Sequence, residues 1–491
     1  MKSIFQKISA FFMSVIMSIL ALFGISPHSE LFCGEWLLEG VPPFEAGVYS
    51  SALYNTGTGL DQEMPTTDTP EPHPALSKMQ LITHTTLPDV NAYCETLSMW
   101  GYTQTFHNRI EDNYFFGYSD GEKNVYFYFN EKNGETRVID DCCNTASYDA
   151  FNSSVEIDPE KAAQPGVYQF SYPYADADHT DSTLYESSGM LYIIVLSDKR
   201  VILIDGGAIK QSTDQNVAEL WRVLHKVTGK KKDTRIKIAL WYGTHNHSDH
   251  TNLFFKLLHD YHKKIDLERV MFNYQSDEVI EKQANVINLR RVVNRRYPNV
   301  SYLKVRSGFR FQLQDADCQV LYTQEDAVNA ADAATSVTNP NDFSAVLRVT
   351  LGEKVFLFLG DSNLKVEQAL LQKFSPAVLR ADVLQAAHHV YNDLSSLYQA
   401  VLPTLVMCPQ SRLRAVSGPL PAYLTLRSLV SDENLFFAGE NLVYGFIPQP
   451  DGSIATKKIK VKCGAYDGTF LPKTEPQPEE SEIESGSVTE P

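Results

Sequence analysis

The pattern of apolar and polar positions predicts a small mixed domain over residues 78–160. Short runs that alternate between apolar and polar residues predict several strands in this region. The pairs Asp120-Gly121 and Asn133-Gly134 lie between these runs and favour tight hairpin turns. A stretch that begins at Pro88 places its apolar residues on one side, which predicts a helix. Acids, bases and nucleophiles do not cluster in this region of the sequence, so we interpret it as a structural or partner-docking module.

A larger domain is predicted over residues 161–465. Apolar runs of strand length alternate there with amphipathic segments of helical period. Because a strand face and a helix stripe must both be buried, this order predicts stacked sheets covered by helices on their outer faces. The composition agrees, since 43% apolar and 21% charged residues over 491 positions are typical of a globular chain with more than one folded unit.

Both ends of the chain depart from this pattern. An uncharged, largely apolar run over residues 8–24 follows two lysines, which is the layout of an export signal or a membrane anchor. We therefore assign residues 1–26 to such a segment and expect an extracytoplasmic protein, either membrane-anchored or secreted. Residues 27–77 are rich in Pro, Gly, Ser and Thr and are predicted to form a low-complexity linker. Residues 466–491 are predicted to be a disordered acidic tail.

Charge and cysteine content limit the classes of partner. The net charge is −17, and an acidic body argues against a general nucleic-acid-binding surface, although nucleic acid could reach a locally positive metal cleft. The seven cysteines include no Cys-x-x-Cys pair and do not indicate a disulfide framework. The partners that we expect are a small-molecule or phosphodiester substrate and, through the N-terminal segment, a membrane.

The strongest chemical signal is the segment THNHSDH, from Thr244 to His250. It follows an apolar strand and precedes an amphipathic helix. Its three imidazoles and one carboxylate would seldom be buried together in a hydrophobic core. Neutral imidazole and carboxylate groups suit Zn²⁺, and also Mn²⁺ or Fe. We therefore expect a metal centre with one or two ions, most simply Zn²⁺.

The motif H-x-H-x-D-H after a strand resembles the hallmark of the metallo-β-lactamase superfamily, and three further segments resemble other parts of that pattern in the same order. LIDGG contains Asp205 and resembles an early strand-end aspartate that supports the metal loop. FLFLGD ends at Asp361 and resembles an aspartate that bridges two metals. ADVLQAAHH ends at His388 and His389 and resembles the closing histidine motif. The resemblance implies an αββα sandwich for the larger domain, beside the small α+β domain.

The same resemblance implies the roles of individual residues. The implied metal ligands are His245, His247, Asp249, His250, Asp361 and His388. Asp205, His389 and Asp342 are implied as supporting or alternative ligands. In this assignment His388 belongs with Asp249, His250 and Asp361. Asp249 and Asp361 are also the candidates for catalysis, because either carboxylate could orient a water molecule or take its proton.

Within the superfamily, the sequence is most similar to the metallohydrolase domain of ComEC-type competence proteins. The matching positions are Asn341, Ser344, Val346, Leu347, Gly360, Asp361, His388 and His389. Val390 stands where that group has glycine. Lactonase, glyoxalase and β-lactamase members carry a further histidine between the main motif and the bridging aspartate. Between residues 251 and 360 this sequence offers only His259 and His262, both predicted on a helix surface, so one metal should be bound more weakly or be missing.

These observations favour a metal-dependent hydrolase that uses a metal-activated water, with phosphodiester bonds as the leading substrate. One alternative is a hydrolase of a small ester, lactone or lactam, and the missing histidine counts against it. A second alternative is a surface-anchored binding protein whose metal centre is structural or decayed. The sequence contains no G-x-S-x-G nucleophile elbow, P-loop or dinucleotide-binding glycine motif.

Overall fold

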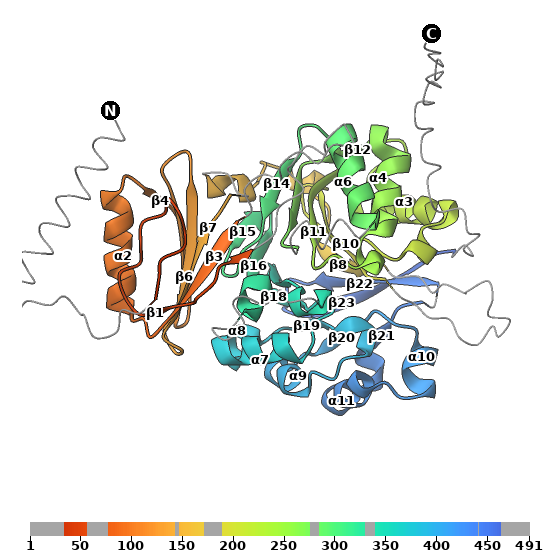
Figure 1. Cartoon of the computed structure of the whole chain (residues 1–491). Helices are drawn as coiled ribbons and strands as arrows, with labels where there is room; N and C mark the ends of the chain where they lie inside the picture. The colour runs from red at the N-terminus through yellow and green to blue at the C-terminus, as the bar shows by residue number, and fades with distance from the viewer. Residues whose placement is uncertain are drawn as a thin grey trace, which may run out of the picture.

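A computed structural model describes the chain in seven stretches, and they form three sheets with flanking helices (Figure 1). The described residues are 34–55, 77–142, 147–170, 189–274, 284–328, 339–439 and 441–462. The predicted export segment 1–26 and the predicted acidic tail 466–491 lie outside these stretches. Within them, no helix is both long enough and apolar enough to cross a membrane.

Among its described residues, the small domain forms one antiparallel sheet covered by one α-helix, and it lies at one end of the molecule (Figure 1). Its strands are β1 (Val48–Tyr49), β2 (Tyr54–Asn55), β3 (Lys78–Thr83), β4 (Thr103–Ile110), β5 (Asn113–Ser119), β6 (Asn124–Asn130) and β7 (Glu135–Asp140). The helix α2 (Leu87–Met99) buries Val90, Tyr93 and Leu97 against one face of this sheet. The helix and the hairpins therefore follow the sequence pattern, because their apolar residues recur at the periods of helix and strand.

Part of the predicted linker 27–77 is folded. Residues 34–55 contain β1 and β2, which both pair with β3, and they bury Leu38, Val41 and Phe44 in the core beneath α2. The abundance of Gly, Pro and Ser suggests a linker when the segment is read alone. Its few apolar residues nevertheless pack on a sheet, and most strands of that sheet come later in the chain.

The larger domain contains two sheets that pack face to face. The first sandwich sheet has the order β14-β13-β11-β10-β9-β8-β22-β23, with β12 on β11. Its strands are β8 (Gly166–Gln169), β9 (Leu191–Val195), β10 (Val201–Asp205), β11 (Ile236–Gly243), β12 (Ile265–Leu267), β13 (Arg269–Phe272), β14 (Ser301–Lys304), β22 (Leu442–Pro448) and β23 (Ile454–Lys460). The second sandwich sheet runs in order from β15 to β21. Its strands are β15 (Arg310–Leu313), β16 (Ala316–Tyr322), β17 (Val346–Leu351), β18 (Lys354–Phe358), β19 (Val383–Gln385), β20 (Leu405–Cys408) and β21 (Leu435–Phe437).

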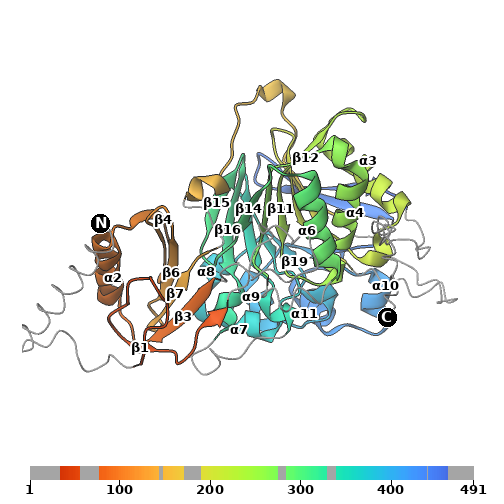
Figure 2. The same cartoon turned by 45° about the horizontal axis from the view of Figure 1, so that its top comes forward.

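Helices cover the outer face of each sandwich sheet (Figures 1 and 2). On the first they are α3 (Asp214–Thr228), α4 (Asn252–Tyr261) and α6 (Ala284–Arg296). On the second they are α7 (Leu364–Lys373), α8 (Pro376–Leu379), α9 (Ser395–Val401), α10 (Arg412–Ser417) and α11 (Pro421–Leu429). Along β9, Ile193 faces the helices, whereas Tyr192 faces the other sheet, where its ring lies 5.3 Å from that of Phe358. The predicted αββα sandwich is therefore confirmed.

The small domain packs directly onto the sandwich. Tyr126 on β6 donates a hydrogen bond to the carbonyl of Ser307 at 2.6 Å. The buried Arg306 forms an ion pair with the buried Asp141 at 2.8 Å. Aromatic residues of both units, such as Tyr126 and Phe309, share one core. The small domain is thus joined to the sandwich by a buried interface.

Candidate metal centre

The ends of four strands bring the candidate residues to one edge of the sandwich. β10 ends at Asp205, and its parallel neighbour β11 ends at Gly243, directly before the histidine-rich segment 244–250. β18 and β19 are parallel neighbours in the second sandwich sheet, and the loops that follow them carry Asp361 and His389. Because the carboxyl ends of parallel neighbours share an edge, side chains far apart in sequence converge there.

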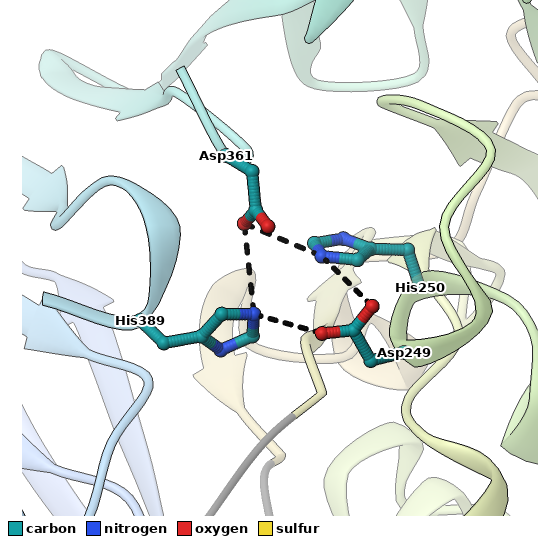
Figure 3. A group of neighbouring side chains, drawn as sticks. All are labelled: Asp249, His250, Asp361 and His389. Carbon is teal, nitrogen blue, oxygen red and sulfur yellow. Dashed lines mark ion pairs between the residues drawn. The ribbon is translucent and has the colours of Figure 1, made fainter. Parts of the chain in front are cut away.

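Two groups of side chains at this edge could each hold a metal ion. The first group contains Asp249, His250, Asp361 and His389 (Figure 3). The second group contains His245, His247 and Asp361. In each group the potential ligand atoms all lie within 4.8 Å of one another, and Asp361 belongs to both. The arrangement is that of two adjacent cation sites that share one carboxylate.

The distances within the first group are short. Nε2 of His250 lies 3.3 Å from Oδ1 of Asp361, and Nε2 of His389 lies 3.6 Å from the same oxygen. Nε2 of His389 also lies 3.1 Å from Oδ2 of Asp249. Figure 3 shows the four side chains pointing toward one another from loops of both sheets. They surround a common point between the two sheets.

The second group lies beside the first. Nε2 of His245 is 3.0 Å from Nδ1 of His247 and 3.7 Å from Oδ2 of Asp361. The His245 and His250 rings lie 4.1 Å apart. Burial lowers the pKa of His245 well below its usual range, so this imidazole is neutral and has a lone pair to offer.

Hydrogen bonds outside the two groups orient their imidazoles. Nδ1 of His250 is 2.6 Å from Oδ2 of Asp205, and Nδ1 of His389 is 3.3 Å from the carbonyl of Pro409. An Nδ1–H that donates to such an oxygen leaves the lone pair on Nε2, which is the atom that faces the group. Asp205 also accepts a hydrogen bond from the backbone N–H of Thr244 at 2.8 Å, which ties β10 to the histidine-rich segment.

Several buried atoms of the first group lack a hydrogen bond. Within the described part of the chain, Nε2 of His250, Nε2 of His389 and Oδ1 of Asp361 have no hydrogen-bond partner. Buried polar atoms are normally paired, because leaving one unpaired costs about 1–3 kcal/mol. Two nitrogen lone pairs and a carboxylate oxygen that converge in this way fit a cation with N and O ligands.

The electrostatics agree with a cation. Burial favours protonation of Asp361, but His250 and His389 outweigh it and hold the pKa of this carboxyl well below its usual range. Burial also opposes ionisation of Asp249, and the same two histidines overcome it and lower its pKa. Burial disfavours the charged form of His250, yet Asp361, Asp205 and Asp249 raise its pKa well above the usual value. The ionised carboxylates therefore favour a positive charge at this buried site, carried either by a proton on His250 or by a metal ion in the place of that proton.

The loop that carries Asp361 is held in place by Gln385 and Ser344, neither of which was among the predicted site residues. Oε1 of Gln385 accepts hydrogen bonds from the backbone N–H groups of Leu359 and Gly360, both at 2.7 Å. Oγ of Ser344, a residue quoted only for its place in the ComEC-type pattern, accepts one from the N–H of Asp361 at 3.0 Å. A polar side chain at the end of the short buried strand Val383–Gln385 was the signal that could have revealed Gln385.

The structure brings most of the predicted site residues together. His245, His247, Asp249, His250 and Asp361 all belong to one of the two groups, and Asp205 supports them. Their role as ligands remains a prediction. His259 and His262 lie on α4 and at its end, where they contact Asp260 and Arg296 rather than the site.

Two placements differ from the sequence prediction. The group of Asp249 and His250 contains His389, not His388, because the turn His388–Val390 has left-handed backbone angles that direct His389 into it. Asp342 belongs to neither group. Its carboxylate instead forms an ion pair with Lys365 at 2.8 Å and accepts a hydrogen bond from Asn363.

Comparisons with known proteins give distant similarities in structure. No protein-family model and no curated protein matches the sequence. CmlA, a diiron β-hydroxylase from Streptomyces venezuelae, is 13% identical with a TM-score of 0.32, and the match covers 62% of this chain and 55% of CmlA. A putative metallo-β-lactamase from Thermotoga maritima is 13% identical with a TM-score of 0.27, covering 45% of this chain and 95% of that one.

A long-form RNase Z from yeast is also similar. It is 13% identical with a TM-score of 0.29, and the match covers 58% of this chain and 45% of the RNase Z. This chain thus spans about half the length of CmlA and of the RNase Z. The three proteins are described with different activities, and we assign none of them to this chain on that basis.

Proposed function

We propose that the protein is a metal-dependent hydrolase, similar to the ComEC-type branch of the metallo-β-lactamase superfamily. The observation that carries this proposal is the pair of His/Asp groups that share Asp361. In the first group, Nε2 of His250, Nε2 of His389 and Oδ1 of Asp361 converge without a hydrogen-bond partner among the described residues. An ion pair that only stabilises the fold would not require two such groups side by side. Zn²⁺ is the ion that we propose, with Mn²⁺ or Fe as alternatives, because the groups offer imidazole and carboxylate ligands.

The bound ion and the side chains of the protein have different roles in the proposed hydrolysis. A divalent cation bound by these side chains supplies Lewis acidity, which polarises the scissile bond and lowers the pKa of water toward neutrality. The pKa values of Asp249 and Asp361 are lowered, so both carboxylates are ionised at neutral pH and either can accept a hydrogen bond from a water molecule and orient it. Asp205 keeps the His250 ring in one orientation throughout.

A phosphodiester is the substrate class that we propose. A cavity of about 490 Å³ is lined by residues 363–365, 391–394 and Pro421, and the first two of these stretches begin two residues after Asp361 and His389. The side chain of Lys365 is 62% exposed there, and the Tyr391 ring lies 5.9 Å from the His388 ring. The guanidinium of Arg414 lies 5.4 Å from the centre of the Tyr391 ring. Lys365, which also pairs with Asp342, lines this cavity, and Arg414 lies against the Tyr391 ring that lines it too; these cations suit an anionic substrate of small size.

The place of action outside the cytoplasm is also a proposal. It rests on the sequence of residues 1–26 alone, which resembles an export signal or anchor. Fractionation of cells that express the full chain tests it. Recovery from the membrane or the medium is the expected result, and recovery from the cytoplasm alone contradicts it.

One experiment separates the proposed activity from its alternatives. The full chain and a His247→Ala variant are purified, analysed for metal content, and assayed with bis-p-nitrophenyl phosphate, a lactone and nitrocefin. Bound metal with phosphodiesterase activity that the variant loses supports the proposal. Activity on only the lactone or nitrocefin indicates a hydrolase of small esters or lactams. A tightly held ion without any turnover indicates a binding protein with a structural metal centre.

A further inference from the structure

Between residues 251 and 360 the sequence has no histidine at the place where lactonase, glyoxalase and β-lactamase members carry a further metal ligand. The second group therefore has only two imidazoles, those of His245 and His247. We propose that His388 supplies the third imidazole. The two adjacent histidines would then serve different cations, His389 the first group and His388 the second. This inference rests on the metal centre of the proposed function, and it goes beyond the two groups described above, neither of which contains His388.

The two oxygens of the Asp361 carboxylate show most directly how His388 and His389 are divided between the two cations. Its Oδ1 atom lies 3.3 Å from Nε2 of His250 and 3.6 Å from Nε2 of His389. Its Oδ2 atom lies 3.7 Å from Nε2 of His245 and 3.7 Å from Nε2 of His388. Each oxygen therefore faces one imidazole from the histidine-rich segment and one from the pair at 388 and 389. His388 thus faces Oδ2 of Asp361 as His389 faces Oδ1, and Nε2 of His388 also lies 3.5 Å from Nδ2 of Asn341.

The backbone explains how consecutive residues reach two neighbouring sites. His388, His389 and Val390 have φ values of 47°, 50° and 68°, all in the left-handed region. Such angles are rare outside glycine and cost most for a β-branched residue such as Val390, so the surrounding structure must hold the turn. The N–H of His388 donates to the carbonyl of Gly360 at 3.1 Å, which anchors the turn beside Asp361. The two rings diverge, with centres 6.0 Å apart and planes at 61°.

The surroundings of the two rings predict unequal affinities. His389 is 5% exposed, and its Nδ1 has the Pro409 carbonyl as a partner. His388 is 31% exposed, and within the described residues its Nδ1 has no hydrogen-bond partner. A ligand without an orienting hydrogen bond binds metal less well, by about 10- to 100-fold for comparable losses. We therefore expect the cation of the His245–His247–His388 set to be the weaker of two.

Calorimetric titration of the metal-stripped full chain with Zn²⁺ tests this assignment. The unmodified chain should take up two ions, one more weakly than the other. His388→Ala should raise the dissociation constant of the weak step by at least about 10-fold and leave the strong step unchanged. His389→Ala should instead impair the strong step. His388→Gln, which keeps a polar side chain of similar reach, should behave like His388→Ala, and His259→Ala on the surface of α4 should behave like the unmodified chain.

Double variants identify which ligands share an ion. His247→Ala with His388→Ala should impair only the weak step, whereas His388→Ala with His389→Ala should impair both. The assignment is overturned if His388→Ala leaves both steps unchanged, if it impairs the strong step, or if the unmodified chain takes up a single ion. Uptake of no ion overturns the proposed metal centre as well, so failure of the assignment can be told apart from failure of the proposed function. Circular dichroism of each variant confirms that it is folded.

Discussion

Oδ2 of Asp205 lies 2.6 Å from Nδ1 of His250, and both side chains are fully buried. This contact determines which nitrogen of the His250 ring faces the first group. We predict that Asp205→Asn lowers the affinity for Zn²⁺ by about 10- to 100-fold, because the amide no longer holds the imidazole through a charged hydrogen bond. Calorimetric titration measures the change. Asp317→Asn, at a partly exposed aspartate paired with Arg310, is the control, and equal affinities in the two variants would contradict the prediction.

Gly360 allows the chain to turn into Asp361. Its φ is +57°, and a Cβ at this position would lie 2.9 Å from Cβ of Thr244, next to the histidine-rich segment. Gly360→Ala should therefore reduce the free energy of unfolding by about 1–3 kcal/mol and weaken metal binding as the loops move apart. Urea denaturation and Zn²⁺ titration measure these two effects. Gly418→Ala, at a glycine with nothing within 4 Å of the added atom, should change neither.

Arg306 joins the small domain to the sandwich through a buried ion pair. Its guanidinium contacts the carboxylates of Asp141 and Glu325, and all three side chains are at most 1% exposed. Arg306→Ala leaves two buried carboxylates without their cation and should cost about 3–5 kcal/mol of stability. Arg310→Ala removes an exposed partner of Asp317 and should cost about 0–1 kcal/mol. Similar urea midpoints for the two variants would show that the interface does not depend on this pair.

In the proposed function, Lys365, which lines the cavity and also pairs with Asp342, supplies a cation to an anionic substrate. Loss of a hydrogen bond to a charged group costs about 1.5–3 kcal/mol, which corresponds to about a 10- to 100-fold change in binding. Lys365→Ala should therefore raise KM for bis-p-nitrophenyl phosphate by that factor and change hydrolysis of a neutral ester much less. Steady-state kinetics with both substrates measure the difference. Lys354→Ala, at a lysine paired with Asp382, is the control, and an equal loss on both substrates would argue against recognition of charge.

The sequence predicted the elements whose patterns are local. The helix α3 and the strands β9 to β11 fall where apolar residues recur at the helical and strand periods. The segment THNHSDH could be identified as a metal-site candidate without any structure, because so many ligand-type side chains seldom occur together in a core. Asp361 was predicted from the resemblance of FLFLGD to a strand-end motif of the metallo-β-lactamase superfamily.

Elements that depend on contacts with residues far away in sequence were not predicted. The hairpin of β22 and β23 comes at the end of the described chain, yet it extends the first sandwich sheet by pairing with β8. Residues 34–55 resemble a linker but pack beneath α2. In each case the stabilising contacts come from residues far away in sequence.

Local patterns of apolar and polar side chains predicted the main helices and strands and the layered architecture, and the resemblance of short motifs to a known family predicted the residues that meet at the strand ends. The folded structure was needed to show which of two neighbouring histidines joins Asp249 and His250, and that Asp342 pairs with Lys365 instead of joining the site. The reason is that the direction of a side chain depends on backbone angles, and the left-handed turn at 388–390 is held by contacts that no local pattern encodes.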